Sequence, residues 1–123
     1  MTQYALIFFE TETEMARRES ETAPQYWSAW SAYIDLLADE NVLVRGSGAG
    51  LQPPSTATTV RVSGDQLQIQ DGPIPGLKEQ LGGVVVIAVE SLDEALRWAA
   101  KAPCAAAGTV EVRPVLPPPP TAA

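Results

Sequence analysis

The chain contains no histidine and only one cysteine, Cys104. Histidine is the commonest general base and the commonest metal ligand, so its absence excludes sites that depend on an imidazole. A single cysteine excludes an internal disulfide and the zinc sites that are built from Cys and His. Carboxylates could still bind a hard cation, but the sequence has no loop in which Asp and Glu gather for one. We therefore expect neither a metal nor another cofactor.

Basic residues are also few. Eight Lys and Arg against fifteen Asp and Glu give a net charge of −7. Residues 1–40 contain eight of the acids and two of the Arg, a net charge of −6, whereas the remainder is nearly balanced at −1. Nucleic acid binding requires a concentrated Lys/Arg surface, and none is present, so we expect no nucleic acid partner. The acidic first third is interpreted as the solvated surface of a helix and a loop.

Long apolar runs are missing as well. The longest, Val84 to Val89, is far shorter than the roughly 20 residues of a membrane-spanning helix. No basic segment followed by an apolar stretch opens the chain, so we expect no signal peptide, no membrane and a cytoplasmic location. The length predicts one domain, residues 1–116, with a sizeable core. Residues 117–123 are rich in proline, cannot join a sheet and are expected to form a flexible tail.

Several segments have the composition of β-strands. Tyr4–Phe9 and Val84–Val89 are apolar throughout, which predicts strands buried on both faces. Other segments predict a short strand, a hairpin with one wet face, and a last strand: Val42–Val44, then Thr58–Val62 with Leu67–Ile69, then Thr109–Val115.

Two helices are predicted between these strands. In the first, one apolar face is formed by Trp27, Trp30, Ile34 and Leu37, with Tyr26 and Tyr33 at its flank. Thr22 with Gln25 predicts a capping box at its start, and Asn41 a stop at its end. The second helix is opened by another capping box, Ser91 with Glu94, and Pro103 lies just beyond its end.

The order of these elements predicts an α+β fold. It is β-α-β-(hairpin)-β-α-β, the ferredoxin-like plan with an antiparallel sheet and an inserted hairpin. In that plan the first and third core strands are central, which agrees with the two strands that are apolar on both faces. Two helices cover only one face of such a sheet. We therefore expect a homodimer in which a second copy covers the other face.

Candidate site residues follow the hairpin. Asp71 continues the period-two face of Leu67 and Ile69, so a partly desolvated carboxylate suited to proton transfer is one interpretation. The commoner role of such an Asp is an Asx turn, in which its side chain accepts a backbone N–H near Gly72. Lys78, Glu79 and Gln80 either surround a small polar ligand with Asp71 or form a solvated turn.

Two arginines and the tryptophans complete the candidates. Arg61 and Arg113 each lie on the polar side of a strand, where they would bind a carboxylate ligand or form a surface ion pair. The three Trp residues are interpreted as packing anchors rather than ligand-stacking groups. Cys104, after a helix end, is interpreted as a small packing residue.

The motifs, taken together and in order, resemble those of the YCII-related family, specifically its DGPF branch. The segments that carry the resemblance are Leu51–Pro54, Thr56–Arg61, Asp71–Pro73, Lys78–Gly83 and Glu111–Pro114. The resemblance implies a dimeric α/β barrel of two ferredoxin-like subunits, with the DGP turn at a cleft between each sheet and its neighbours. It also implies that some related proteins use a His–Asp pair, and that at least one is similar to enzymes that eliminate HCl from a chlorinated aromatic ring. Without histidine, this chain cannot use that pair.

Three functions remain open. The first is a homodimer that binds a small molecule in a cleft at the sheet or dimer interface, in an accessory or regulatory role beside the sigma-factor-like regulators that the resemblance implies. The alternative is a cofactor-free enzyme of proton-transfer or elimination type on a small cyclic or aromatic acid, with Asp71 or Glu79 as base. The third is a purely structural dimer. The missing histidine favours the binding protein over the enzyme.

Overall fold

The computed structural model describes residues 1–118. Its helices and strands are β1 (Thr2–Glu10), α1 (Glu12–Ala16), η1 (Arg17–Glu19), α2 (Ala23–Asp39), β2 (Ala49–Gly50), η2 (Pro54–Thr56), β3 (Thr58–Ser63), β4 (Gln66–Asp71), β5 (Gln80–Val89), α3 (Leu92–Ala100) and β6 (Thr109–Pro114). The two long helices, the hairpin and the strands β1, β5 and β6 follow in the predicted order, but the predicted strand Val42–Val44 forms only a single bridge, from Leu43 to Ile87. The last strand, β6, ends at Pro114. Most of the predicted tail, residues 119–123, lies outside the described residues.

One antiparallel sheet organises the molecule. Its strand order is β2-β5-β1-β6, with Leu6 of β1 opposite Val85 of β5 and Val112 of β6. The two strands that are apolar on both faces are the central ones, as predicted. Residues 42–44 run beside β5, where the Val44 N–H donates to the Val86 carbonyl at 2.9 Å. The ferredoxin-like α+β fold is confirmed.

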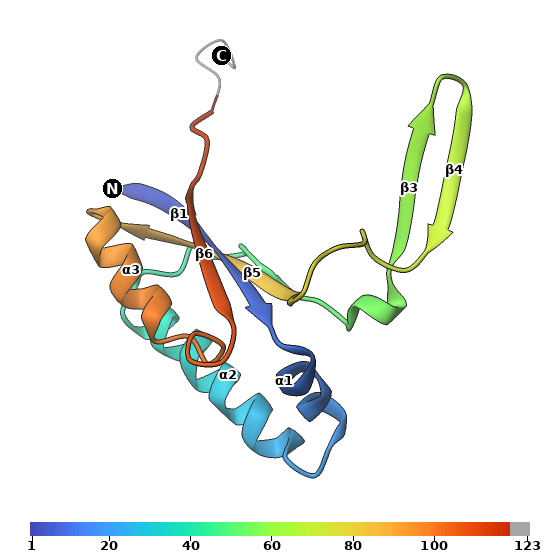
Figure 1. Cartoon of the computed structure of the whole chain (residues 1–123). Coiled ribbons are helices and arrows are strands. Elements are labelled where there is room, and N and C mark those ends of the chain that lie inside the picture. The colour runs from blue at the N-terminus through green and yellow to red at the C-terminus, as the bar shows by residue number, and fades with distance from the viewer. Residues whose placement is uncertain (119–123) are drawn as a thin grey trace.

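Helices α2 and α3 cover one face of this sheet (Figure 1). Alternate residues of β1 and β5 point toward the helices and form the core with them, and the largest fully buried apolar side chains are Leu6, Leu37, Ile87 and Val89. On α3 the buried residues are small, Ala95 and Ala99, so this helix packs close to the sheet. Cys104 is buried in the same core, as expected of a small packing residue.

Two predictions about α2 are wrong. Its buried residues are Tyr26, Tyr33 and Leu37, whereas Trp27, predicted on the apolar face, is 47% exposed. The Tyr26 side chain turns inward because its hydroxyl has a buried hydrogen-bond acceptor. The Thr22 side chain caps no backbone N–H and accepts instead from Arg17 Nε, so the predicted capping box is absent.

Other local predictions are confirmed. Ser91 Oγ accepts from the Glu94 N–H at 3.2 Å and caps α3. Asn41 lies just after α2 with φ of 58°, the left-handed conformation that commonly ends a helix. One is wrong: within the acidic first third, where we expected a loop before the long helix, residues 12–19 form the short helices α1 and η1.

The second face of the sheet carries a row of apolar side chains that α2 and α3 do not cover. These belong to the alternate residues of the central strands, Ala5, Ile7, Phe9, Val84 and Val86, all partly exposed. No other element of residues 1–118 has its apolar side chains buried against them. We call this surface the open sheet face.

The hairpin formed by β3 and β4 stands away from the sheet (Figure 1). We call it the arm. The predicted hairpin is confirmed, and its register places Val60 opposite Ile69 and Val62 opposite Leu67. We expected one wet face, but both faces of the arm are exposed within the described chain.

Candidate functional site

A buried carboxylate ends β1. Glu10 is 2% exposed and lies on the helix-covered side of the sheet, in line with Tyr4, Leu6 and Phe8. Tyr26 Oη donates to Glu10 Oε1 at 2.6 Å, and Arg18 Nη2 donates to Glu10 Oε2 at 3.2 Å. Arg18 Nε also donates to Tyr26 Oη at 2.9 Å. These three side chains form a closed network that we call the Glu10 cluster.

Local structure brings the members of the Glu10 cluster together. Thr11 Oγ1 accepts from the Glu14 N–H at 3.1 Å and starts α1 immediately after β1. The short helices α1 and η1 then reverse the direction of the chain, so that Arg18 lies over the end of β1. Tyr26 reaches the same point from the first turns of α2.

Arg18 also binds the main chain of two other segments. It donates to the carbonyl of Leu51 and, at 3.4 Å, to that of Gly82. Its guanidinium lies 5.1 Å from the ring centroid of Trp27, within the range of a cation–π contact. The charge of Arg18 is therefore neutralised by Glu10 and most of its N–H donors are in use, so this arginine is poorly placed to bind an anionic ligand.

Burial governs the chemistry of Tyr26. Desolvation first, and the hydrogen bond to Glu10 second, raise the pKa of its hydroxyl to about 12. The phenol therefore remains protonated near neutral pH and can keep donating to the carboxylate. A buried ion pair of this kind stabilises a fold only when its remaining hydrogen-bonding capacity is satisfied, as it is here.

Gly82 and Gly83, at the start of β5, leave room for the Glu10 cluster and for β2 because neither carries a Cβ atom. The register of β1 and β5 shifts between Phe8 and Phe9, which leaves Gly82 unpaired as a β-bulge. A Cβ on Gly82 would lie 2.5 Å from Glu10 Oε2, and one on Gly83 would lie 2.9 Å from the Ala49 carbonyl oxygen. The backbone of β5 is thus closely approached at these glycines, by a carboxylate at Gly82 and by β2 at Gly83.

A cavity of about 530 Å³ opens beside this cluster, between α2 and the β2 edge of the sheet. Arg18 and Tyr26 belong to its wall, and Ser31 and Asp35 of α2 contribute polar groups. Most of the remaining lining is apolar or main chain: Phe8, Trp27, Trp30, Ile34, Ser47–Gly50 and Gly82–Val85. A cavity of this size and polarity is typical of small-molecule sites.

The rings in the wall are held in place. Trp30 packs edge-on against Phe8 with ring centroids 4.9 Å apart. Ser47 Oγ binds both the N–H and the carbonyl of Val86, at 3.1 and 3.2 Å, and so is already satisfied. The cavity therefore offers a ligand mainly flat apolar surfaces, plus the carboxylate of Asp35 and the hydroxyl of Ser31.

The structure places the sequence-predicted residues elsewhere. Asp71 ends β4 and Lys78 lies in the following loop, both exposed, while Glu79 and Gln80 are half-buried at the start of β5. Arg61 is exposed on the arm. None of these residues lines the described cavity.

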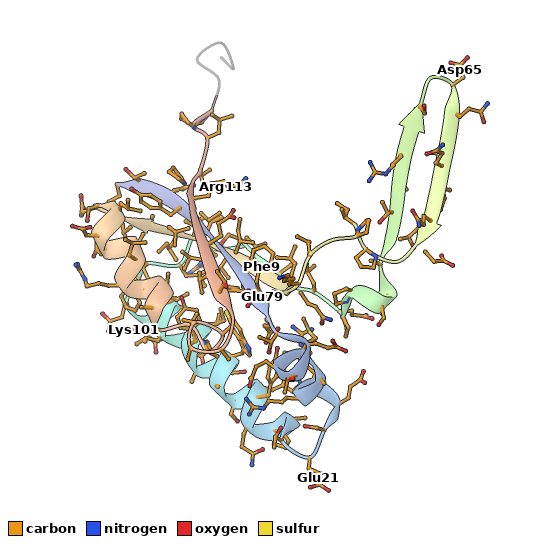
Figure 2. The ribbon with its side chains drawn as sticks, in the orientation of Figure 1. Phe9, Glu21, Asp65, Glu79, Lys101 and Arg113 are labelled. Atoms are coloured by element: carbon orange, nitrogen blue, oxygen red, sulfur yellow. The ribbon has the colours of Figure 1, made fainter. Side chains whose placement is uncertain are left out.

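Nor do they form one pocket within residues 1–118. Arg113 pairs with Glu111 and lies opposite Ala5, whereas Gln80 lies opposite Glu10. Five residues of strand separate these points, about 17 Å at 3.3 Å per residue. Figure 2 shows Glu79 and Arg113 apart in this way. Their role toward a ligand stays a prediction.

The Asx turn proposed for Asp71 has a different arrangement. The Gly72 N–H, a candidate donor to that carboxylate, donates instead to the Ala57 carbonyl at 2.8 Å. Thr59 Oγ1 donates to the Gly72 carbonyl at 2.7 Å and closes the base of the arm. The turn is thus fixed by the opposite strand rather than by Asp71.

The sequence reasoning missed the Glu10 cluster, since it assigned Glu10 and Arg18 to a solvated acidic surface. One pattern could have found Glu10, because it continues the alternation of Tyr4, Leu6 and Phe8. In residues 1–118, no three Asp, Glu or Cys side chains converge as metal ligands would. No helix of this part of the chain has the length and hydropathy needed to cross a bilayer.

Comparison with known proteins places the chain among its relatives. The sequence profile of the YCII-related domain matches residues 3–118. A protein of Rhizobium meliloti (strain 1021), named only as uncharacterized, is 37% identical over 100 residues, which cover 72% of this chain and 81% of that protein. The profile spans nearly the whole fold, including β1, the arm and β6. The chain belongs to the YCII-related domain family.

Proposed function

We propose that this protein is a homodimeric small-molecule binding protein of the DGPF branch of the YCII-related family. The branch assignment is supported by the Asp71–Pro73 and Lys78–Gly83 motifs. The observation that carries the binding function is the cavity of about 530 Å³ between α2 and the β2 edge, where aromatic side chains line a space large enough for a metabolite. An accessory or regulatory role fits a protein that binds without converting its ligand.

The lining favours an aromatic ligand that is uncharged or cationic. Trp27, Trp30 and Phe8 offer ring faces and edges, against which a flat ring packs well. The one arginine in the wall is already paired with Glu10, whereas Asp35 contributes a carboxylate. The net charge of −6 in residues 1–40 also disfavours anions near α2.

The enzyme alternative receives no support from this cavity. Its proposed bases, Asp71 and Glu79, do not line the cavity, and its proposed substrates are acids, which the lining disfavours. Glu10 does not line the cavity either, and both of its oxygens already accept hydrogen bonds, one from Tyr26 and one from Arg18.

A matched ligand series tests the proposal. 2-Naphthylmethylamine, 2-naphthol and 2-naphthoate share one ring system but differ in charge, and Trp fluorescence reports their binding. We expect the amine and the phenol to bind at least about 10-fold more tightly than the acid, a difference of about 1.4 kcal/mol. Trp30→Ala should abolish the binding of all three.

Two variants of α2 separate the effect of Asp35 from general charge. Asp35→Asn should weaken the amine but not the phenol, whereas Asp39→Asn, one turn further along and outside the cavity lining, should affect neither. Preferential binding of the naphthoate would contradict the proposed ligand class. If none of the three ligands binds at millimolar concentration, the cavity is not the site.

A further inference from the structure

The arm has one apolar and one polar face. Its register places Val60, Val62, Leu67 and Ile69 on the same side, and these side chains are 57–69% exposed. The other side carries only polar residues: Thr59, Arg61, Ser63, Gln66, Gln68 and Gln70. This alternation is that of a hairpin whose apolar face packs on another surface.

No surface of residues 1–118 packs against the apolar face of the arm, whose side chains are exposed. A two-stranded hairpin alone is marginally stable in water, so an exposed apolar face of this kind requires a partner. The base of the arm is fixed by the bond from Gly72 to Ala57 and by the Thr59 hydroxyl, and η2 lies immediately before it. Thus held, the arm stands away from the sheet (Figure 1).

We propose that the arm of each chain packs its apolar face on a second copy, against the open sheet face. The inference rests on the homodimer of the proposed function and adds the element that reaches across it. One chain carries both an uncovered apolar arm and an uncovered apolar sheet face. A two-fold axis covers both surfaces of both copies at once, because each copy supplies the surface that the other leaves exposed.

Dimensions and area agree with this arrangement. Six residues of strand span about 20 Å and the ten of β5 about 33 Å, so an arm reaches across much of a partner's sheet. Each of the four apolar arm side chains buries about 60–120 Å², on the basis of about 25 cal/mol per Å² and 1.5–3 kcal/mol per side chain. The arms of two copies thus supply about 500–1,000 Å² before the sheet faces contribute, and stable interfaces bury about 1,200–2,000 Å².

The distribution of charge also permits a second copy. Residues 1–40 account for −6 of the net charge of −7, and the part of them that follows β1 forms α1, η1 and α2. Helix α2 lies on the face of the sheet opposite to the proposed contact. On the open sheet face, Arg113 is paired with Glu111. Two identical chains therefore meet through surfaces with little like-charge repulsion.

Sedimentation velocity on the full chain, from 0.5 to 100 µM, tests the proposal. We expect a dimer for the wild type and at least a 10-fold weaker dimer for Val62→Lys. The matched control, Gln68→Lys, adds the same charge to the polar face of the same hairpin and should leave the dimer unchanged. Both residues are exposed, so near-ultraviolet circular dichroism should show an intact monomer fold in each variant.

A cross-link identifies the surface that the arm contacts. Leu67 is replaced by the photoreactive residue benzoylphenylalanine, and this chain is mixed with an isotope-labelled wild-type copy. We expect cross-links from the arm to residues 2–10 or 80–89 of the labelled chain. A monomeric wild type would overturn both the homodimer and the arm contact. A dimer that Val62→Lys leaves intact, or cross-links to the arm's own chain or to another surface, would overturn the arm contact alone.

Discussion

Burying the carboxylate of Glu10 costs several kcal/mol in lost hydration, and that cost is offset only because donors meet both of its oxygens. Tyr26 supplies one donor and Arg18 the other, and the two donors also bind each other. The resulting network joins β1, η1 and α2 at one point. It therefore holds α2 against the sheet beside the cavity that Trp27 and Trp30 line.

Removing one hydroxyl should test this network. Tyr26→Phe leaves Glu10 Oε1 buried without its 2.6 Å donor, so we expect the free energy of unfolding to fall by about 1–3 kcal/mol. Urea denaturation measures the change. The control is Tyr4→Phe, because Tyr4 is also buried but its hydroxyl makes no hydrogen bond to residues 1–118. Equal losses in the two variants would show that the network contributes nothing specific.

At the scale of helices and strands, the sequence correctly predicts those elements whose formation depends on residues close together in the chain. The prediction of the two central strands is correct because a short, uninterrupted apolar run is typical of a strand with neighbours on both sides. Helix α3 is correct because Ser91 and Glu94 make its cap within four residues. The inserted hairpin is correct for the same reason, because its alternating strands and its turn are local in sequence.

What the sequence could not predict depends on contacts between distant residues. Trp27 is more apolar than Tyr26, so hydrophobicity alone places the wrong ring inside; the buried acceptor for Tyr26 lies 16 residues away. Arg18 looks solvated until α1 and η1 return it to the end of β1. The exposure of the arm, too, depends on where η2 directs the hairpin and not on its own pattern.

The close packing of β5 against the Glu10 cluster gives the second test. In Gly82→Ala the new Cβ would meet Glu10 Oε2 at 2.5 Å and Arg18 Nη2 at 3.1 Å, so the ion pair must shift. We expect a loss of about 1–3 kcal/mol in the free energy of unfolding, the usual range for overpacking. At Gly50 a Cβ would meet nothing within 4 Å, so Gly50→Ala should change stability by less than about 0.5 kcal/mol.

Over the whole molecule, a few neutral acids buried against the helices link stability to pH. Desolvation is the largest cause in each case: it raises the pKa of Tyr33, and it raises those of Tyr26 and the Cys104 thiol to about 12. Their ordinary values are 10 for a tyrosine and 9 for a cysteine. In alkali the unfolded chain therefore loses these protons before the folded chain does, which favours unfolding.

The sign of this linkage predicts an alkaline limit. The stabilisation from these three groups is fully present below pH 9 and is lost as the pH rises toward about 12, by about 1.4 kcal/mol per pH unit for each group that is ionised only in the unfolded chain. Cys104 should act first, between pH 9 and 10, because its unfolded pKa is the lowest. Urea unfolding from pH 7 to 11, followed by Trp fluorescence, should show the decline begin near pH 9 in the wild type and near pH 10 in Cys104→Ala. If both proteins decline from the same pH, the buried thiol does not contribute to the alkaline limit.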